Sequence, residues 1–157
     1  MTSPLAIGQS CVGYRSRKVS RTLARVFNAA MRPLDLPVTQ FAVLVAVDAE
    51  PGDTMAVLAT RLNTDPSTAV RLALALEKRG LLASDNGRGR NGKRLRLTAS
   101  GRALLKEAMA AWQRTHDMIA GELGEREMQR LLSGLARLET CALKIENELH
   151  NRDHGHE

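Results

Sequence analysis

The feature that most constrains the fold is a pair of short amphipathic segments joined by a tight turn. Apolar residues of the first segment recur at helical spacing: Met55, Leu58, Ala59 and Leu62. Asn63 and Thr64 interrupt this pattern, because their side chains compete for backbone hydrogen bonds and favour turns. Asp65 and Pro66 are residue types preferred at the N-cap and at the first position of a helix. The sequence therefore predicts two helices joined by a turn, the second one beginning at Pro66.

The second predicted helix has one apolar face and one polar face. Its apolar face consists of Ala69, Ala73 and Leu76, and Gly80 is a suitable terminator. The polar face and the preceding turn carry candidate DNA-binding residues: Thr64, Ser67, Thr68, Arg71 and Lys78. A helix with small hydroxyls and an arginine near its N-terminus, placed after a short helix and a turn, is typical of a helix-turn-helix. For this stretch alone, an ordinary helical hairpin in an all-α domain is the alternative.

Residues 86–96, NGRGRNGKRLR, favour the DNA-binding interpretation. Two Asn-Gly pairs are strong turn signals, and Leu95 and Leu97 alternate with polar residues as in a half-buried strand. The sequence thus predicts a β-hairpin with a cationic tip, a wing. Its candidate DNA-binding residues are Arg88, Arg90, Lys93 and Arg94.

The same stretch contains GxGxxG, at Gly87, Gly89 and Gly92. A dinucleotide-binding loop needs a helix that opens at the last glycine, whereas an alternating strand is predicted to follow here, so we interpret these residues as hairpin glycines. Positive charge is concentrated around them: residues 61–106 contain eleven Lys/Arg and three Asp/Glu, while residues 122–157 contain five and eight. This asymmetry predicts a polyanionic partner, double-stranded DNA, at the helix-turn-helix and wing.

The last predicted helix carries a heptad pattern. Its apolar positions are spaced alternately by three and four residues: Met128, Leu131, Leu135, Leu138, Ala142, Ile145 and Leu149. An amphipathic stripe also runs along residues 15–31. We predict a homodimer whose interface includes Val19, Leu23, Leu131, Leu135, Leu138, Ile145 and Leu149; packing of the seam only within one monomer is the alternative.

The predicted fold class is mainly α with a small β-hairpin, a winged helix-turn-helix with N- and C-terminal dimerisation helices. Thr39 is predicted to cap a helix that ends near Pro51, and Thr98 a long helix through about Leu123 that Gly121 and Gly124 break. The expected organisation is a flexible or docking arm at 1–14, first helices on the dimerisation and ligand side at 15–50, the winged helix-turn-helix at 51–100, long dimerisation helices at 101–150 and a disordered tail at 151–157.

Several other function classes find little support in the sequence. Two cysteines, Cys11 and Cys141, cannot form a disulfide framework and are consistent with a reducing cytosol. No apolar run reaches membrane-spanning length and no signal peptide is recognised, so a cytoplasmic protein without membrane contact is expected. His116 stands apart from the other histidines, His150, His154 and His156, which lie in the tail or directly before it. We therefore expect no catalytic residues, no metal site and no cofactor.

Four segments resemble the MarR family of bacterial transcription regulators: VTQFAVL at Val38–Leu44, LATRLNTDPSTAVR at Leu58–Arg71, LEKRGLL at Leu76–Leu82 and LTASG at Leu97–Gly101. The resemblance extends from about Arg15 to Leu138. It implies a homodimeric winged helix with interlocked first and last helices, and a recognition helix supplied by the second segment. It also implies a regulator that commonly represses a neighbouring operon and releases DNA when a phenolic ligand or an oxidant reaches the junction between the dimer and the DNA-binding domain.

The sequence departs from the family pattern at two places. Gly89, Arg90 and Asn91 occupy the positions of the family's Asp-x-Arg wing signature, and Gly13 occupies the second position of the Cys-x-Cys pair that begins at Cys11 in some oxidant sensors. We predict a repressor of a near-palindromic operator, released by a small aromatic or phenolic ligand. The candidate ligand-binding residues are Tyr14, Arg17, Phe41, Trp112 and His116. The alternatives are an oxidant sensor acting through Cys11 and an architectural DNA-binding protein without ligand control.

Overall fold

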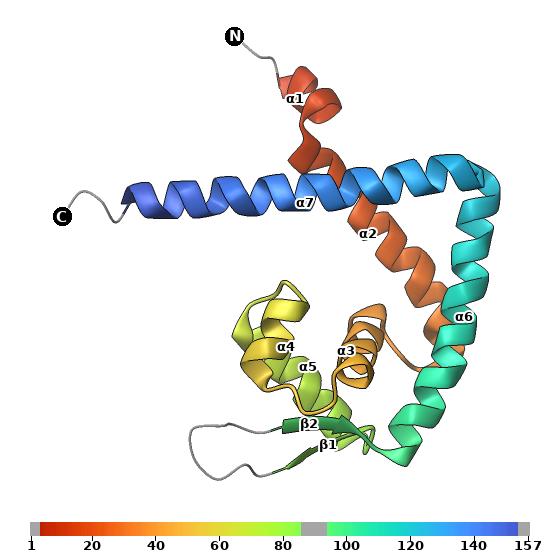
Figure 1. Cartoon of the computed structure of the whole chain (residues 1–157). Helices are drawn as coiled ribbons and strands as arrows, with labels where there is room; N and C mark the ends of the chain where they lie inside the picture. The colour runs from red at the N-terminus through yellow and green to blue at the C-terminus, as the bar shows by residue number, and fades with distance from the viewer. Residues whose placement is uncertain (1–3, 86–93, 154–157) are drawn as a thin grey trace. The chain divides into compact units, whose positions relative to one another are not determined.

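The computed structural model describes residues 4–85 and 94–153 (Figure 1). The chain divides into two compact units, Met1–Thr115 and His116–Glu157, with the boundary inside α6. The elements in chain order are α1 (Pro4–Ser10), α2 (Val12–Met31), the 3-10 helix η1 (Arg32–Leu34), α3 (Val38–Ala49), α4 (Met55–Arg61), α5 (Pro66–Lys78), β1 (Leu82–Asp85), β2 (Arg94–Leu97), α6 (Ala99–Leu123) and α7 (Glu125–Asp153). The predicted fold class, a mainly helical chain with a small antiparallel hairpin, is confirmed.

Helices α4 and α5 form the predicted helix-turn-helix. The Thr54 side chain caps α4 by accepting a hydrogen bond from the Val57 N–H at 3.4 Å, and Leu58 and Ala59 are buried. Asn63 adopts a left-handed conformation in the turn (φ 47°), which an asparagine tolerates better than most residues. Gly80 follows α5 with a φ of 68°, as expected for a glycine that ends a helix.

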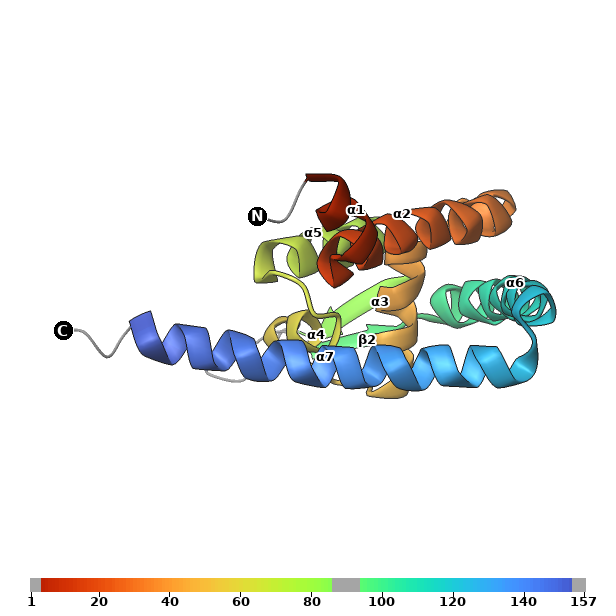
Figure 2. The same ribbon diagram turned by 90° about the horizontal axis from the view of Figure 1, so that it is seen from above.

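One aliphatic core holds the first unit together. Helices α3, α4 and α5 lie on the same side of the hairpin (Figure 1), and the view from above shows α3 over its strands (Figure 2). The largest fully buried side chains of the described residues come from α2, α3, α4, α5, β2 and the segment before α3: Met31, Leu36, Val43, Leu44, Val47, Leu58, Leu76 and Leu95. Polar residues of α4 and α5 that do not enter this core, including Thr60, Ser67 and Arg71, are exposed.

The hairpin is a two-stranded antiparallel sheet whose second strand leads into α6. Its strands are antiparallel, with Leu82 opposite Leu97 and Asp85 opposite Arg94. Leu95 and Leu97 are buried while Arg94 and Arg96 are exposed, which confirms the predicted alternation. The Thr98 side chain caps α6, as predicted, by accepting a hydrogen bond from the Gly101 N–H at 3.0 Å.

The start of α6 packs very closely against the chain before β1. A Cβ atom added at Gly101 would lie 2.0 Å from the carbonyl oxygen of Leu81, so no side chain fits there without a backbone shift. The Thr98 N–H donates to the same Leu81 carbonyl at 3.1 Å. This contact fixes how the hairpin leads into the long helix.

The start of α3 differs from the prediction. The helix begins at Val38 after the N-cap Pro37, so Thr39 is not its cap. Instead, the Asn28 side chain of α2 accepts a hydrogen bond from the Val38 N–H at 2.7 Å. Proline cannot cap a helix with its side chain, and the residue that does so is ten positions away in the sequence.

The helix boundaries near the chain ends also differ from expectation. Residues 4–10 form α1 although their sequence shows no periodicity, and α2 begins at Val12, three residues before the predicted start. Of the two glycines predicted to break the long helix, Gly121 lies within α6. Gly124, with a φ of 82°, separates α6 from α7. Helix α7 continues through Asp153, past the predicted start of the tail; residues 154–157 lie outside the described part.

Among residues 4–85 and 94–153, no single helix is long and apolar enough to cross a membrane. Residues Val12–Leu34 and Val38–Ala49 reach that length and composition only when they are taken together, and they are bent by 79° at the break between them.

Candidate nucleic-acid interface and ligand cavity

The N-terminus of α5 is held by Asp65. One carboxylate oxygen of Asp65 accepts hydrogen bonds from the Thr68 N–H at 2.8 Å and from the Ser67 hydroxyl at 2.5 Å. The bonds from Ser67 and Thr68 lower the pKa of Asp65 well below its usual range, because they stabilise the charged form. The cap is therefore ionised near neutral pH, and the Ser67 oxygen is left as an acceptor for other partners.

The exposed side of α5 presents the predicted DNA-binding side chains. Ala69, Ala73 and Leu76 are buried, as predicted, and they hold the helix against the core. On the opposite side, Ser67 and Arg71 are exposed and four residues apart, so they are neighbours on the helix surface. The remaining predicted residues of this surface are the half-buried Thr64 and Thr68 and the exposed Lys78. The helix thus offers a hydroxyl and a guanidinium close to its N-terminus.

Most of the residues predicted to form the tip of the wing lie outside the described part of the chain. Arg88, Arg90 and Lys93 lie outside the described residues, as do Gly89 and Asn91 of the altered wing signature. Arg94 begins β2, and its guanidinium donates a hydrogen bond to the Gly52 carbonyl at 3.3 Å. A strand therefore follows the three hairpin glycines, as predicted, and not the helix that a dinucleotide-binding loop needs.

Arg96 and Asp85 form an ion pair across the hairpin. Sequence reasoning did not identify this pair. The alternation of β2 placed Arg96 on the exposed side, but the partner depends on the register of the two strands. Arg96 is therefore partly neutralised by Asp85.

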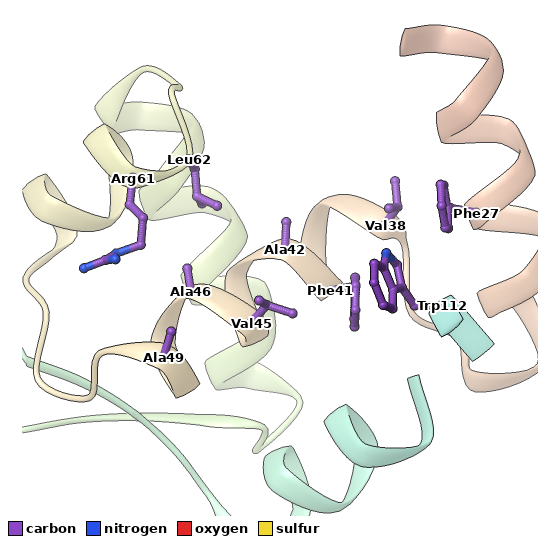
Figure 3. A pocket seen from close by; sticks show the side chains of 10 residues that line it. All are labelled: Phe27, Val38, Phe41, Ala42, Val45, Ala46, Ala49, Arg61, Leu62 and Trp112. Atoms are coloured by element: carbon purple, nitrogen blue, oxygen red, sulfur yellow. The ribbon is translucent and has the colours of Figure 1, made fainter. Parts of the chain in front are cut away.

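A cavity of about 470 Å³ lies along α3 (Figure 3). Its lining comes from four helices and from the residue after α4: Phe27, Val38, Phe41, Ala42, Val45, Ala46, Ala49, Arg61, Leu62 and Trp112. Figure 3 shows aromatic side chains gathered at one end, alanines along α3 and Arg61 at the opposite end. Arg61 alone carries a formal charge among these described lining residues. The lining therefore suits an apolar molecule with one polar or anionic end.

Two of the five candidate ligand-binding residues, Phe41 and Trp112, line this cavity. Tyr14 and Arg17 are exposed on α2 and are not among its lining residues. His116 also does not line it, and its ring nitrogen Nδ1 lies 4.0 Å from a carboxylate oxygen of Asp117. Sequence reasoning missed Arg61, because one arginine at the end of a short helix is indistinguishable from an ordinary surface charge.

Cys11 lies between α1 and α2 and is exposed, as is Cys141 on α7. The Cys11 carbonyl accepts a hydrogen bond from the Arg15 N–H at 3.0 Å, and the backbone at Gly13 is close enough that an added Cβ would lie 3.9 Å from the Cys11 sulfur. A thiol at this position is accessible to oxidants.

Apolar stripes are exposed on two helices. On α2, Val19 is 51% and Leu23 38% exposed. On α7, the exposed members of the predicted seam are Leu131, Leu135, Ala142, Ile145 and Leu149, while Leu138 is half-buried and Met128 is buried. Uncovered large apolar side chains in rows of this length are typical of surfaces that another protein chain covers.

The described residues contain no group of three or more His, Cys, Asp or Glu side chains that could hold a metal ion. His154 and His156 lie outside the described part of the chain.

Comparison with known proteins identifies solved structures that are similar to most of this chain. A model of the MarR family matches residues 34–90, which contain α3, the helix-turn-helix and β1. The structure of the transcriptional repressor CouR bound to p-coumaroyl-CoA is 30% identical, with a TM-score of 0.78 over 85% of this chain and 94% of that one. CouR bound to a 23-mer DNA duplex is 29% identical, with a TM-score of 0.79 over 88% and 99% of the two chains.

The M. tuberculosis transcriptional regulator MosR in complex with DNA is also similar. It is 29% identical, with a TM-score of 0.78 over 87% of this chain and 98% of that chain. The family match, the extent of these similarities and the winged helix-turn-helix agree. The chain therefore belongs to the MarR family of bacterial DNA-binding transcription regulators.

Proposed function

We propose that this protein is a homodimeric, sequence-specific repressor that a small aromatic ligand releases from its operator. The observation that carries the proposal is the cavity beside α3, because its lining includes Arg61 and Leu62 from the helix-turn-helix itself. A molecule bound there would contact both the aromatic side chains of the core and the end of α4, the first helix of the helix-turn-helix. Occupancy of the cavity and the position of that helix are then linked.

DNA recognition is assigned to the exposed side of α5. Arg71 can bind a guanine through two hydrogen bonds in the major groove, and Ser67 and Thr68 lie one turn earlier, where they reach bases or the nearest phosphates. Lys78, Arg94 and the wing residues Arg88, Arg90 and Lys93 are assigned to the DNA backbone or the minor groove. Dimer symmetry predicts a near-palindromic site with half-sites about 10 bp apart.

The exposed stripes on α2 and α7 are assigned to the dimer interface. Each contains several large side chains that water would otherwise contact. Replacing Leu135 and Leu138 with Asp places unpaired charges in that interface at a cost of several kcal/mol. Light scattering should then detect monomers or aggregates; a variant that stays dimeric and binds DNA at micromolar concentration would contradict the assignment.

The solved relatives support a regulator with two kinds of partner. CouR has been solved with a DNA duplex and with p-coumaroyl-CoA, and MosR with DNA. These ligands belong to those proteins. For this chain, they support double-stranded DNA as one partner and a small organic effector as the other.

The test is a titration of the DNA upstream of the gene against a scrambled duplex of equal length. We expect the upstream DNA to bind at least about a thousandfold more tightly, as specific regulators do. Uniform, weak binding to both duplexes would instead support an architectural DNA-binding protein. A small aromatic acid should lower affinity for the upstream DNA in the same assay.

An oxidant sensor acting through Cys11 is the second candidate, and the exposure of that thiol is the observation that favours it. We expect peroxide to change operator binding little, because Gly13 replaces the second cysteine of the pair seen in some sensors. Release by peroxide that thiol reductant reverses, and that Cys11→Ser abolishes, would overturn this expectation.

A further inference from the structure

We propose that Arg61 binds the anionic end of an elongated ligand in the α3 cavity and, by giving up Asp53, weakens the attachment of the wing to α4. The inference rests on the proposed function, in which this cavity holds the effector. It adds the chemical class and length of the ligand, the residue that detects its charge, and the connection from that residue to β2.

The length of the ligand follows from the positions of the two ends of the cavity. Phe27, Phe41 and Trp112 lie at one end and Arg61 at the other (Figure 3). The residues of α3 that line the cavity extend from Val38 to Ala49, a distance of about 16 Å along the helix axis. A ring the size of benzoate cannot reach both ends, so the complementary ligand is an aromatic group joined to a carboxylate by an aliphatic chain.

The middle of the cavity is suited to such a chain. Ala42, Ala46 and Ala49 are spaced by four and three residues and form one strip on α3, and all three line the cavity. Their small side chains leave room that larger residues would fill. Each methylene group buried there contributes about 0.8 kcal/mol in transfer free energy, which corresponds to about a fourfold gain in affinity.

Without a ligand, Arg61 is already paired with a carboxylate of the protein itself, that of Asp53. Its Nε and Nη2 atoms lie 3.1 Å and 3.0 Å from the same oxygen, Oδ2 of Asp53. A guanidinium binds a carboxylate best through two parallel hydrogen bonds, one to each oxygen. A ligand carboxylate entering from the cavity can offer both oxygens to Arg61, so it competes with Asp53 for the same donors.

Breaking the Arg61–Asp53 pair affects the wing because Asp53 is also hydrogen-bonded to β2. Its carbonyl accepts a hydrogen bond from the Leu95 N–H of β2 at 3.1 Å, and the Leu95 carbonyl accepts one from the Gly52 N–H at 2.9 Å. The next residue, Thr54, caps α4 and forms a β-bridge with Arg94. Asp53 is thus held by α4 through its side chain and by β2 through its main chain.

These contacts make the Arg61–Asp53 pair a connection between the cavity and the wing. While the pair is intact, the end of α4, the segment 52–54 and β2 constrain one another. When Arg61 turns to a ligand carboxylate, the Asp53 side chain loses that constraint and the segment can shift relative to α4. A ligand of equal shape without charge leaves the pair intact and therefore lacks this effect.

The first test measures ligand class by isothermal titration calorimetry of the full-length protein. The probes are phenylalkanoates with the carboxylate at the chain end, from phenylacetate to 8-phenyloctanoate, and the matching carboxamides. We expect affinity to rise about fourfold per methylene until the chain reaches Arg61, and the longest carboxylate to bind about tenfold more tightly than its amide. Absence of binding by the whole series, or equal binding of acid and amide, would overturn the proposal.

Variants assign the charge preference to Arg61. Arg61→Met keeps an apolar stem in the cavity but removes the guanidinium, so acid and amide should bind with equal affinity, close to that of the amide for the wild type. The amide titration also establishes that the variant is folded. Arg114→Met is the matched control, since Arg114 lies on α6 beside a different cavity, and it should retain the preference. A preference that persists in Arg61→Met excludes this residue.

The second test measures the connection to the wing. Fluorescence anisotropy gives operator affinity with and without saturating 8-phenyloctanoate. The ligand should lower the affinity of the wild type about tenfold, but that of Asp53→Asn and Arg61→Met less than twofold, because both variants lack the pair that the ligand breaks. A full response in either variant would overturn the connection.

The two proposals fail in distinguishable ways. Without specific DNA binding, the proposed function fails, although calorimetry still reports the preference for long carboxylates. If the protein binds its operator and short or neutral aromatics release it equally well, only the inference about Arg61 fails.

Discussion

Helices α3 and α5 are neighbours of nearly equal length, with 12 and 13 residues, and both contribute to the same core. Arg79, directly after α5, donates a hydrogen bond to Gln40 of α3 at 2.8 Å. Their remaining surfaces nevertheless differ. Helix α5 turns a hydroxyl and cations outward beside the partly exposed Val70 and Leu74, whereas the second surface of α3 is apolar and lines the cavity.

From this difference we infer that the two helices, which share one core, bind different partners. An exposed polar surface can exchange water for phosphates and base edges. An apolar surface gains free energy only when another apolar group covers it. We therefore assign DNA binding to α5 and effector binding to α3, and substitutions in the two helices should affect different measurements.

The largest effects should be common to both helices. Leu44 of α3 and Leu76 of α5 are fully buried, so Leu44→Ala and Leu76→Ala should each lower the free energy of unfolding by about 2–5 kcal/mol. Urea denaturation measures both. Val45→Ala, at an exposed position of α3, is the control and should cost under about 1 kcal/mol. A core leucine that costs no more than Val45 would show that the helices do not share one core.

The next effect should be confined to α5. Arg71→Ala should weaken operator binding by about 1–3 kcal/mol per half-site and relax the preference at one base pair. Binding to a scrambled duplex and to the effector should change little. Lys78→Ala, on the same surface, should weaken both duplexes alike and lower the salt dependence by about one phosphate contact. Equal loss for both duplexes in Arg71→Ala would contradict its assignment to base recognition.

A smaller effect should be confined to α3. Ala42 is half-buried and lines the cavity, so Ala42→Leu should occupy ligand space and weaken effector binding roughly tenfold, about 1.4 kcal/mol. Calorimetry measures this loss, and operator affinity without effector should stay within about twofold of the wild type. A parallel fall in both affinities would mean that the surfaces of α3 and α5 are not separable.

The smallest effect should appear only in acid. The N-terminus of α5 is capped by the ionised Asp65 and that of α3 by the neutral amide of Asn28. Because the folded pKa of Asp65 is lowered, its stabilisation is complete above the unfolded pKa of about 3.9 and is lost as pH falls below it. The stability difference between wild type and Asp65→Asn should therefore shrink below about pH 4. Asn28→Ala should differ from the wild type by a constant amount over the same range, and a constant difference for Asp65→Asn would contradict the role of its charge.

The predictions that depended on neighbouring residues were the successful ones. Asp65 and Pro66 start a helix because the cap and the fixed φ of proline act within one turn. Leu95 and Leu97 point inward because alternate residues of a strand face opposite sides. Gly80 ends α5 with a positive φ for an equally local reason. These features could be predicted without knowing where the rest of the chain lies.

Sequence patterns were insufficient where partners are distant along the chain. The cap of α3 comes from Asn28 and not from Thr39, and the cavity combines Phe27, Phe41, Arg61 and Trp112 from four helices. Helix α3 is apolar at most positions, so periodicity could not separate its core side from its cavity side. Val45 is 40% exposed, although the adjacent Leu44 is fully buried.

Sequence by itself determined the winged helix-turn-helix, the exposed polar residues of α5 and the heptad pattern of α7, since each depends on the spacing of residues within one element. Tertiary structure decided which apolar positions are buried, which line the cavity, and that Arg61 at its end is paired with Asp53 beside β2. The physical reason is that periodicity specifies the faces of a helix, but the identity of what each face meets depends on how separate elements pack.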